Sequence, residues 1–289
     1  MMTFSVLSWP ASIRTHLYPM VATVLSLPGF LLVLSLVALT NTAFANPIAE
    51  HEHGTEPDSP ELESELGSKS GECSRISNYA IYLSGIHTGT MNRTETWQGN
   101  TAVVTSISEA SILGIGTQYH QRAELSWSST TNEWLTDKFH QTVTGFHARD
   151  MWVTFENNGH NSRVDIDGDI DTYASEKIPL RDVDTLTIQI REYLLQGRKQ
   201  FALTRQASDA IERYQFYVQD TLTTNIAPWG ELTLIPVEQT GAEDVTYYFA
   251  PAMDYQLIKA RYHGIILHGL IELESYTSSC EPRSAEARR

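Results

Sequence analysis

Met151-Trp152-Val153-Thr154-Phe155, followed one residue later by Asn157-Asn158-Gly159, is the stretch that decides the fold class. Its first five residues include the β-branched and aromatic side chains that strands favour. Asn and Gly readily take the positive φ angles of tight hairpin turns. The stretch therefore predicts a β-strand that turns straight back into an antiparallel neighbour.

The same pattern extends in both directions, from Ser77 to Tyr276. Polar and apolar residues alternate over short runs, and Gly, Asn and Asp separate the runs, as is typical of consecutive antiparallel strands. We expect about ten to twelve strands on this pattern. Among them are residues 79–83, 102–108, 122–127, 151–155, 200–208, 211–221, 230–237, 245–250, 256–263 and 266–276.

One segment departs from this alternation. Between Asp182 and Gly197 the apolar residues fall at helical spacing on one face, at positions 183, 186, 190, 193 and 194. Asp182 is a suitable N-cap, and Gly197 is a suitable C-terminal stop. We therefore expect one amphipathic helix at about residues 182–197.

The fold class that follows is mostly β, in a single domain over residues 73–281. The sequence shows neither an internal repeat nor a second domain boundary. A long antiparallel sheet must curl or close to protect its edges, and the apolar face of the helix must be buried. Both demands are met by a long curved antiparallel sheet, or an incomplete barrel, with the helix packed on it.

The N-terminal residues 1–45 have the pattern of a secretory signal peptide. They contain one charged side chain, Arg14, and end in an apolar run followed by Thr42-Ala43-Phe44-Ala45. The small residues at 43 and 45 fit a cleavage site between Ala45 and Asn46. The apolar run is short for a membrane span, so we expect no stable span after cleavage. An uncleaved anchor and a start at Met20 remain as alternatives.

Residues 46–72 contain eight acidic residues and one lysine, with few large apolar side chains. Such a segment cannot bury enough surface to offset the entropy of ordering, so we expect a disordered linker there and a disordered tail at 282–289. The formal net charge of the whole chain is −15, and it becomes −16 when Arg14 is removed with the signal peptide. This charge argues against nucleic acid or an anionic membrane surface as a partner.

Two cysteines, Cys73 and Cys280, lie just outside the two ends of the patterned region. In an oxidising compartment we expect them to form a disulfide that holds the first and last strands together. A redox role is not indicated, because the sequence contains no C-x-x-C.

The order of these elements resembles a bacterial envelope family known as domain of unknown function 3108, over roughly Asn78 to Ser275. The matching features are Tyr79 through Gly85 and Gly89, then Asp184-Thr185-Leu186 leading into a helix that ends at Gly197, Trp229-Gly230-Glu231-Leu232, Tyr248-Phe249-Ala250-Pro251, and Lys259 in a closing hairpin. Met253-Asp254-Tyr255-Gln256-Leu257 lacks the proline of that pattern. The resemblance implies a periplasmic β protein and supplies no catalytic residues.

Four carboxylates alternate along one short segment, at Asp165, Asp167, Asp169 and Asp171. In an extended strand, side chains on one face are ~6.6–7 Å apart, too far to surround a calcium ion. If Asp167-Gly168 makes a tight turn, the four could converge. We keep this segment as the one hypothesis for a metal site, with Ca²⁺ as the candidate ion and a solvated acidic hairpin as the alternative.

The sequence contains no G-x-S-x-G, H-E-x-x-H, P-loop or dinucleotide-binding motif. No cofactor is therefore indicated beyond the candidate calcium ion. The sequence predicts an exported, noncatalytic periplasmic protein that binds an apolar small molecule, a lipid or an envelope protein partner in or on its curved sheet. The alternative is a hydrolase whose catalytic residues are dispersed along the chain.

Overall fold

The computed structural model describes residues 72–112, 115–145, 148–264 and 268–282. The expected signal peptide with its Ala45-Asn46 cleavage site, nearly all of the 46–72 linker and nearly all of the 282–289 tail lie outside these residues. Within the described part, no helix is long and apolar enough to cross a membrane.

The described residues form sixteen strands, one α-helix and one 3-10 turn. The strands before the helix are β1 (Glu72–Leu83), β2 (Ile86–Gln98), β3 (Thr101–Ile112), β4 (Ile115–Ser128), β5 (Glu133–Gly145), β6 (Arg149–Glu156), β7 (Asn161–Ile166), β8 (Asp169–Ala174) and β9 (Leu180–Arg181). The helix α1 (Val183–Leu195) follows. After it come β10 (Gln200–Gln206), β11 (Ile211–Val218), β12 (Leu222–Ile226), β13 (Gly230–Gly241), β14 (Val245–Ala250), η1 (Pro251–Met253), β15 (Gln256–His263) and β16 (His268–Ser278).

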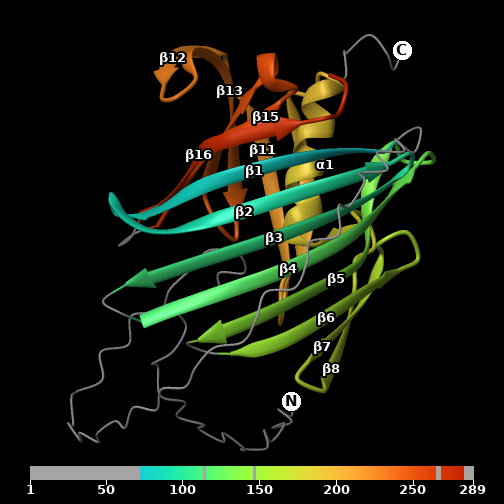
Figure 1. Ribbon diagram of the computed structural model, residues 1–289. Coiled ribbons are helices and arrows are strands. Elements are labelled where there is room, and N and C mark those ends of the chain that lie inside the picture. The colour runs from blue at the N-terminus through green and yellow to red at the C-terminus, as the bar shows by residue number, and fades with distance from the viewer. Residues whose placement is uncertain (1–71, 113–114, 146–147, 265–267, 283–289) are drawn as a thin grey trace, which may run out of the picture. The chain divides into compact units, whose positions relative to one another are not determined.

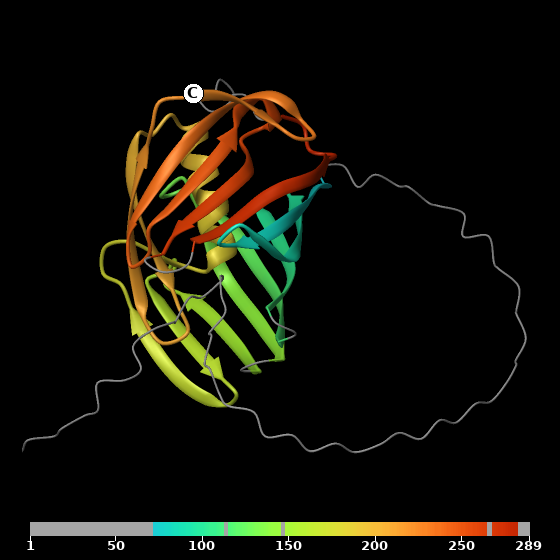
Figure 2. The same cartoon turned by 90° about the vertical axis from the view of Figure 1, so that its left-hand side faces the viewer.

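The strands form one sheet in the order β8-β7-β6-β5-β4-β3-β2-β1-β16-β15-β14-β13-β11-β10-β9, and β12 pairs with β13 outside this path. Neighbours are antiparallel except β9 and β10, which are parallel. Figure 1 shows β1 and β2 crossing in front of α1. Figure 2 shows the orange strands that follow the helix on its opposite side, with the red β15 and β16 connecting the two sides. The sheet therefore curls around α1 as an incomplete barrel, and the predicted fold class is confirmed.

The structure contains more strands than the ten to twelve expected. β2 is rich in Thr, and β8 is an edge strand that is exposed along nearly its whole length. β9 has only two residues. These strands lack the repeated large apolar side chains by which the others were recognised.

The ends of α1 agree with the sequence. The Asp182 carboxylate accepts from the backbone N–H groups of Asp184 and Thr185. At the other end, Gly197 (φ +73°) donates to the Leu194 carbonyl, and Arg198 donates to the Tyr193 carbonyl at 2.9 Å. This pair of bonds is a Schellman motif, which requires a residue of positive φ and hence favours Gly.

The surroundings of α1 differ from the expectation of a helix with one solvated face. Its apolar residues are buried except Val183, which is partly buried, and most of its polar residues are buried as well: Asp184, Thr185, Gln189, Arg191 and Glu192. The helix is enclosed because both halves of the sheet cover it. Its polar side chains therefore need partners inside the molecule.

Side chains from α1 and β9 also bond the backbone at the start of β5. The Trp134 N–H donates to Gln189 Oε1 at 2.6 Å, and the Trp134 carbonyl accepts from Arg181 Nε at 2.9 Å. The pairing of β5 with β6 begins only at Lys138. The free backbone of β5 is thus satisfied by side chains instead of a neighbouring strand.

The predicted disulfide is present. Cys73 of β1 is bonded to Cys280, 207 residues away and just beyond β16, and β1 and β16 are antiparallel neighbours. Both cysteines pack against an apolar cluster that includes Trp97, Val104 and Leu125. The bond joins the first and last strands of the described residues, as the sequence indicated.

Candidate binding surface on the outer face of the sheet

The register of β2 to β5 sorts their side chains onto two faces. Val104 and Ala123 are opposite each other, fully buried, and share a cluster with Ile188 of α1. They define the inner face. Glu109, five residues after Val104, is opposite Gln118, five residues before Ala123, so both lie on the outer face because side chains alternate along a strand.

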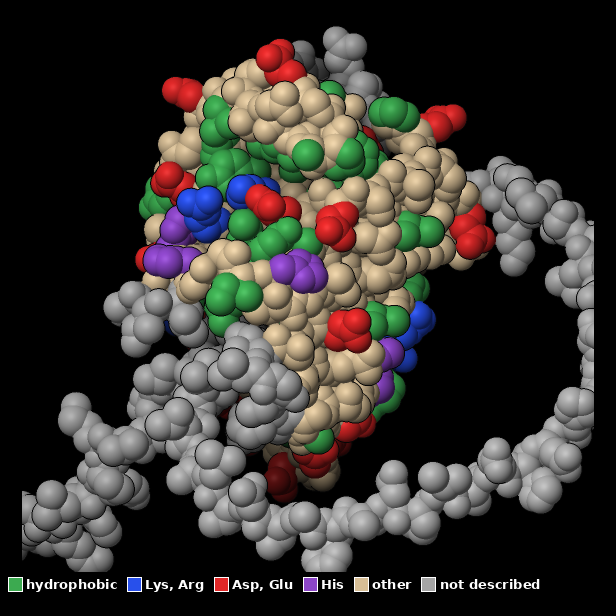
Figure 3. Space-filling view, turned by 60° about the vertical axis from the view of Figure 1, so that its left-hand side comes forward, with side chains coloured by type: hydrophobic (Ala, Val, Ile, Leu, Met, Phe, Trp, Pro, Cys, Tyr) green, Lys and Arg blue, Asp and Glu red, His purple; other side chains and the backbone are tan. Residues whose placement is uncertain are grey.

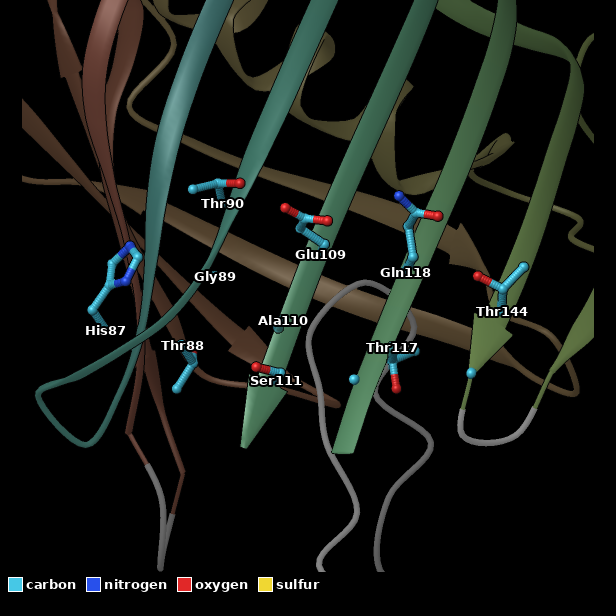
Figure 4. Close-up of a pocket in the computed structure, with 12 residues that line it drawn as sticks. His87, Thr88, Gly89, Thr90, Glu109, Ala110, Ser111, Thr117, Gln118 and Thr144 are labelled. Atoms are coloured by element: carbon cyan, nitrogen blue, oxygen red, sulfur yellow. The ribbon is translucent and has the colours of Figure 1, made fainter. Parts of the chain in front are cut away.

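A groove of about 560 Å³ crosses one end of β2 to β5. Thr90, Glu109, Gln118 and Thr144 are successive cross-strand partners, and Figure 4 shows them in one line across the four strands. The other lining residues are His87, Thr88, Gly89, Ala110, Ser111, Gly116, Thr117 and Gly145. Ala110 and Thr117, which are opposite each other one residue away, belong to the inner face, and the part of the groove formed by the line of four belongs to the outer face.

Glycines shape the strands at this end. A Cβ on Gly89 would lie 1.9 Å from the carbonyl oxygen of Glu109, and one on Gly145 would lie 2.3 Å from the carbonyl oxygen of Gly116. Gly145 also has φ +91°, which other residues rarely adopt. The close approach of neighbouring backbones therefore depends on Gly at both positions.

The groove offers hydrogen-bonding groups. Its outer-face line presents two hydroxyls, one amide and one carboxylate, and Ser111 adds another hydroxyl. Among these lining residues, Ala110 is the only one with a purely hydrocarbon side chain. The groove can therefore bond a polar chain, and it lacks the apolar walls that a lipid tail needs.

Ionised side chains connect α1 to the inner face. Arg93 of β2 bonds the Asp184 carboxylate, and its Nη2 donates to the Asp184 carbonyl at 3.2 Å. Asp254 bonds both Arg75 of β1 and Arg191 of α1. All of these residues are largely buried, so they stabilise the native state only while the pairs are intact.

Three guanidinium groups set the charge of Glu95, which lies beside them. Burial alone would raise the pKa of Glu95, but Arg93, Arg75 and Arg191, in that order, lower it below its usual range. Asp182 behaves in the opposite way: burial, together with the nearby Asp184 carboxylate, raises its pKa. The interior therefore holds two carboxylates whose pKa values are displaced in opposite directions.

The arrangement that most resembles catalytic machinery lies on the outer face of β5 and β6. His140 Nε2 is 2.6 Å from Asp150 Oδ1, and the same Nε2 is 3.4 Å from the Thr142 hydroxyl. A catalytic relay needs the carboxylate and the nucleophile on different ring nitrogens. Here both contact one nitrogen, so these three residues do not form a relay.

The acidic segment forms a hairpin between β7 and β8. Asp167 (φ +53°) and Gly168 (φ +98°) make its two-residue turn. Asp165 lies on the outer face, opposite Ile170, whereas Asp171 is opposite the buried Val164 on the inner face.

The turn therefore does not bring the four aspartates together. Asp169 is opposite Ile166, and Asp167 Oδ1 accepts from the backbone N–H of Asp150 at 3.0 Å. Within the described ranges, no group of three or more His, Cys, Asp or Glu side chains is placed to hold a metal ion.

Charge is distributed over the surface. On the face shown in Figure 3, Asp and Glu side chains are spread widely, and the fewer Lys and Arg side chains appear at two separate places.

The groove residues were not found from the sequence. Threonine and serine at strand ends are common, and only the register brings Thr90, Glu109, Gln118 and Thr144 into one line. The available signal was an isolated Gly inside a strand pattern, as at Gly89, which often marks a bend or a close approach of backbones.

Comparison with known proteins supports the fold. The crystal structure of a β-barrel-like protein of domain of unknown function DUF1849 from Brucella abortus is similar to this chain with a TM-score of 0.51 and 7% sequence identity. The match covers 72% of this chain and 98% of that one. No family model and no curated protein matches the chain. The resemblance to family 3108 therefore stays a prediction, and a β-barrel-like fold is what the comparison supports.

Proposed function

We propose that this chain is an exported, noncatalytic protein of the bacterial periplasm that binds an envelope protein partner through the groove on the outer face of β2 to β5. The observation that carries the proposal is the polar groove itself, in which side chains from four strands form a line that can bond an extended polypeptide. Main-chain and side-chain hydrogen bonds are what such grooves offer a peptide.

Export is supported by the disulfide between Cys73 and Cys280, because such bonds persist in oxidising compartments. The signal pattern of residues 1–45 points to the same compartment. Recovery of the protein from the periplasm with a mass equal to residues 46–289 less two hydrogens would test cleavage and the disulfide together. A mass that includes residues 1–45 would overturn cleavage at Ala45.

A protein partner is favoured over an apolar ligand for two reasons. The groove has hydroxyl, amide and carboxylate groups where a lipid tail would need hydrocarbon. The interior of the curled sheet is occupied by α1, whose Leu186, Ile188 and Ile190 are buried. A lipid bound inside would have to displace this helix.

The groove is tested by site-specific photocrosslinking in cells. A benzophenone amino acid at Gln118 or Thr144 should give one adduct of fixed mass in the periplasm. The control position is Glu274, which is exposed on β16, and it should give none. Absence of an adduct at both groove positions, or the same adduct at Glu274, would overturn the proposal. Organic extraction of the purified protein tests the alternative, an apolar ligand. A lipid recovered in stoichiometric amount would favour that alternative over a protein partner.

A further inference from the structure

Trp152 is exposed on the outer face of β6 although it is one of the largest apolar side chains of the chain. Half of its surface is accessible to solvent. An exposed Trp in a fixed orientation is a frequent feature of binding surfaces, because the ring offers a large contact area at little entropic cost.

The indole of Trp152 is held in place by its neighbours. One face is stacked on the His140 ring, with centroids 3.7 Å apart and an angle of 12° between planes. Its Nε1 donates to Asp150 Oδ2 at 3.0 Å. The carboxylate that holds the indole also contacts His140, which lowers the pKa of Asp150. The ring is therefore oriented before any partner arrives.

The second face of the indole points along the sheet toward β7 and β8. The cross-strand row reads His140, Trp152, Asp165 and Ile170. Since His140 covers one face from β5, the other lies on the side of Asp165. Ile170, 52% exposed on the edge strand β8, ends the row.

Three carboxylates lie near the indole of Trp152, and one of them, Asp165, is on the side of its free face. Asp165 accepts from the Gly168 N–H at 3.0 Å and is 3.5 Å from Arg163, an exposed and long contact. Asp167 bonds the backbone of Asp150. Among the ion pairs of the described residues, neither Asp150 nor Asp167 is joined to Lys or Arg. Near the indole, the three carboxylates of Asp150, Asp165 and Asp167 thus stand against one guanidinium group, that of Arg163.

We infer that the free face of Trp152, together with Asp165, binds an arginine or lysine side chain of the envelope partner. A cation within ~6 Å of a Trp centroid is attracted by the ring, and the carboxylate opposite Trp152 in the row supplies the complementary charge. Exposed apolar surface at Ile170 can pack against the stem of such a side chain.

This inference rests on the proposed function and extends it. His140, Thr142 and Thr144 alternate on the outer face of β5, so the Trp152 row lies about 13 Å from the groove along one strand, at ~6.6 Å per two residues. A partner segment of a few residues can reach both. The groove would bond its backbone, and Trp152 would select a cationic side chain.

The test uses the disulfide-bonded protein and the peptide acetyl-Gly-Arg-Gly-Arg-Gly-amide. The same peptide with citrulline in place of arginine is the neutral control. Binding is followed by the indole N–H resonance of Trp152, assigned with Trp152→Phe. The arginine peptide should shift this resonance saturably, and the citrulline peptide should bind about fivefold more weakly.

Variants separate the site from the general negative charge. Trp152→Ala and Asp165→Asn should each weaken binding of the arginine peptide by about twofold to fivefold. Glu274→Gln removes an equal charge from an exposed position on β16 and should leave binding unchanged. Circular dichroism and Tm confirm that each variant is folded.

Equal binding of both peptides, or equal loss in Glu274→Gln and Asp165→Asn, would overturn the inference. Saturation of the Trp152 resonance by a neutral tetrasaccharide without any response to arginine would overturn it as well and would identify a sugar platform. Failure of the photocrosslinking at Gln118 and Thr144 with intact arginine binding would refute the groove and leave this site standing.

Discussion

Substitution of Arg93 by Met tests whether the buried ion pair holds α1 in the sheet. Arg93 Nε is 3.1 Å from Glu95 Oε1, and its Nη1 bonds the Asp184 carboxylate. Arg93→Met keeps the length of the side chain and removes these bonds. The Asp184 carboxylate would keep one partner, the Ser106 hydroxyl at 3.0 Å. It would remain buried without its counter-ion.

The expected cost follows from burial. The side chains of Arg93 and Asp184 are 9% and 5% exposed, and removal of one member of such a pair costs about 3–5 kcal/mol. The control is Lys259→Met, which breaks a surface pair with Glu272 whose side chains are 25% and 40% exposed. Pairs of that kind contribute about 0–1 kcal/mol.

The assay is urea unfolding at pH 7 with the disulfide intact, followed by circular dichroism. A double variant, Arg93→Met with Asp184→Leu, completes a thermodynamic cycle. It should be at least about 2 kcal/mol more stable than the sum of the single effects predicts, because it leaves neither charge of the pair buried alone. The reasoning is refuted if Arg93→Met costs no more than Lys259→Met, or if the two single effects add.

Further predictions concern the disulfide, the groove, the interior and the acidic hairpin. Replacement of Cys73 and Cys280 by Ser should lower the free energy of unfolding by up to about 5 kcal/mol, since the bond closes a loop of 207 residues; an effect under about 1 kcal/mol in urea unfolding would contradict this. Gly89→Ala should lower the free energy of unfolding by about 1–3 kcal/mol because its Cβ would meet the Glu109 carbonyl. Gly116→Ala, whose Cβ would be 3.8 Å from its nearest neighbour, should be almost neutral. Equal Tm values for the two variants would contradict the close approach of the backbones at Gly89. Because the pKa of Asp182 is raised in the native state, the native protein binds this proton more tightly than the unfolded chain, and the contribution of Asp182 to stability falls as the pH rises above about 4. The variant Asp182→Asn should therefore gain stability relative to wild type between pH 4.5 and 7.5. Parallel pH profiles of the two proteins would disprove this. Millimolar Ca²⁺ should leave the Tm within about one degree, and a larger increase would show that the β7–β8 hairpin binds the ion.

Much of the fold could be predicted from the sequence because local rules and tertiary packing agree. The Asn157-Asn158-Gly159 turn has φ values of +52°, +54° and +80°, as its residue types indicated. The helix begins after its N-cap Asp182 and stops before Gly197, as these two residue types predicted. Each of these features is decided by residues within one turn of it.

The polar interior could not be predicted in the same way. Arg93 and Asp184 are 91 residues apart in sequence, and Arg191 and Asp254 are 63 apart. Nothing near either residue distinguishes it from a solvated charge, and only the curl of the sheet makes them neighbours. The apolar face of α1 could be predicted because helical periodicity is a local property of the sequence. The burial of its polar side could not, because it depends on distant strands.

The candidate surface was hidden for a related reason. Trp152 belongs to the stretch that first indicated a strand, and an aromatic residue on a strand is more often a core residue. The alternation of Met151 and Val153 with Trp152 places the indole on the opposite face from those two buried side chains. Alternation shows that the two faces of a strand differ. It does not show which face is the core when each face carries an aromatic residue, as Trp152 and Phe155 do here.

The position of α1 decides which face of the sheet is available to a partner. Barrel interiors commonly hold ligands, and the curled sheet would suggest the same here. Release of α1 would expose Leu186, Ile188 and Ile190 and would break the pairs of Arg93 with Asp184 and of Arg191 with Asp254. A ligand inside would have to offset each of these losses, at about 1.5–3 kcal/mol for each apolar side chain alone. A partner on the outer face displaces nothing, and for this reason the groove and Trp152 are where binding should be sought.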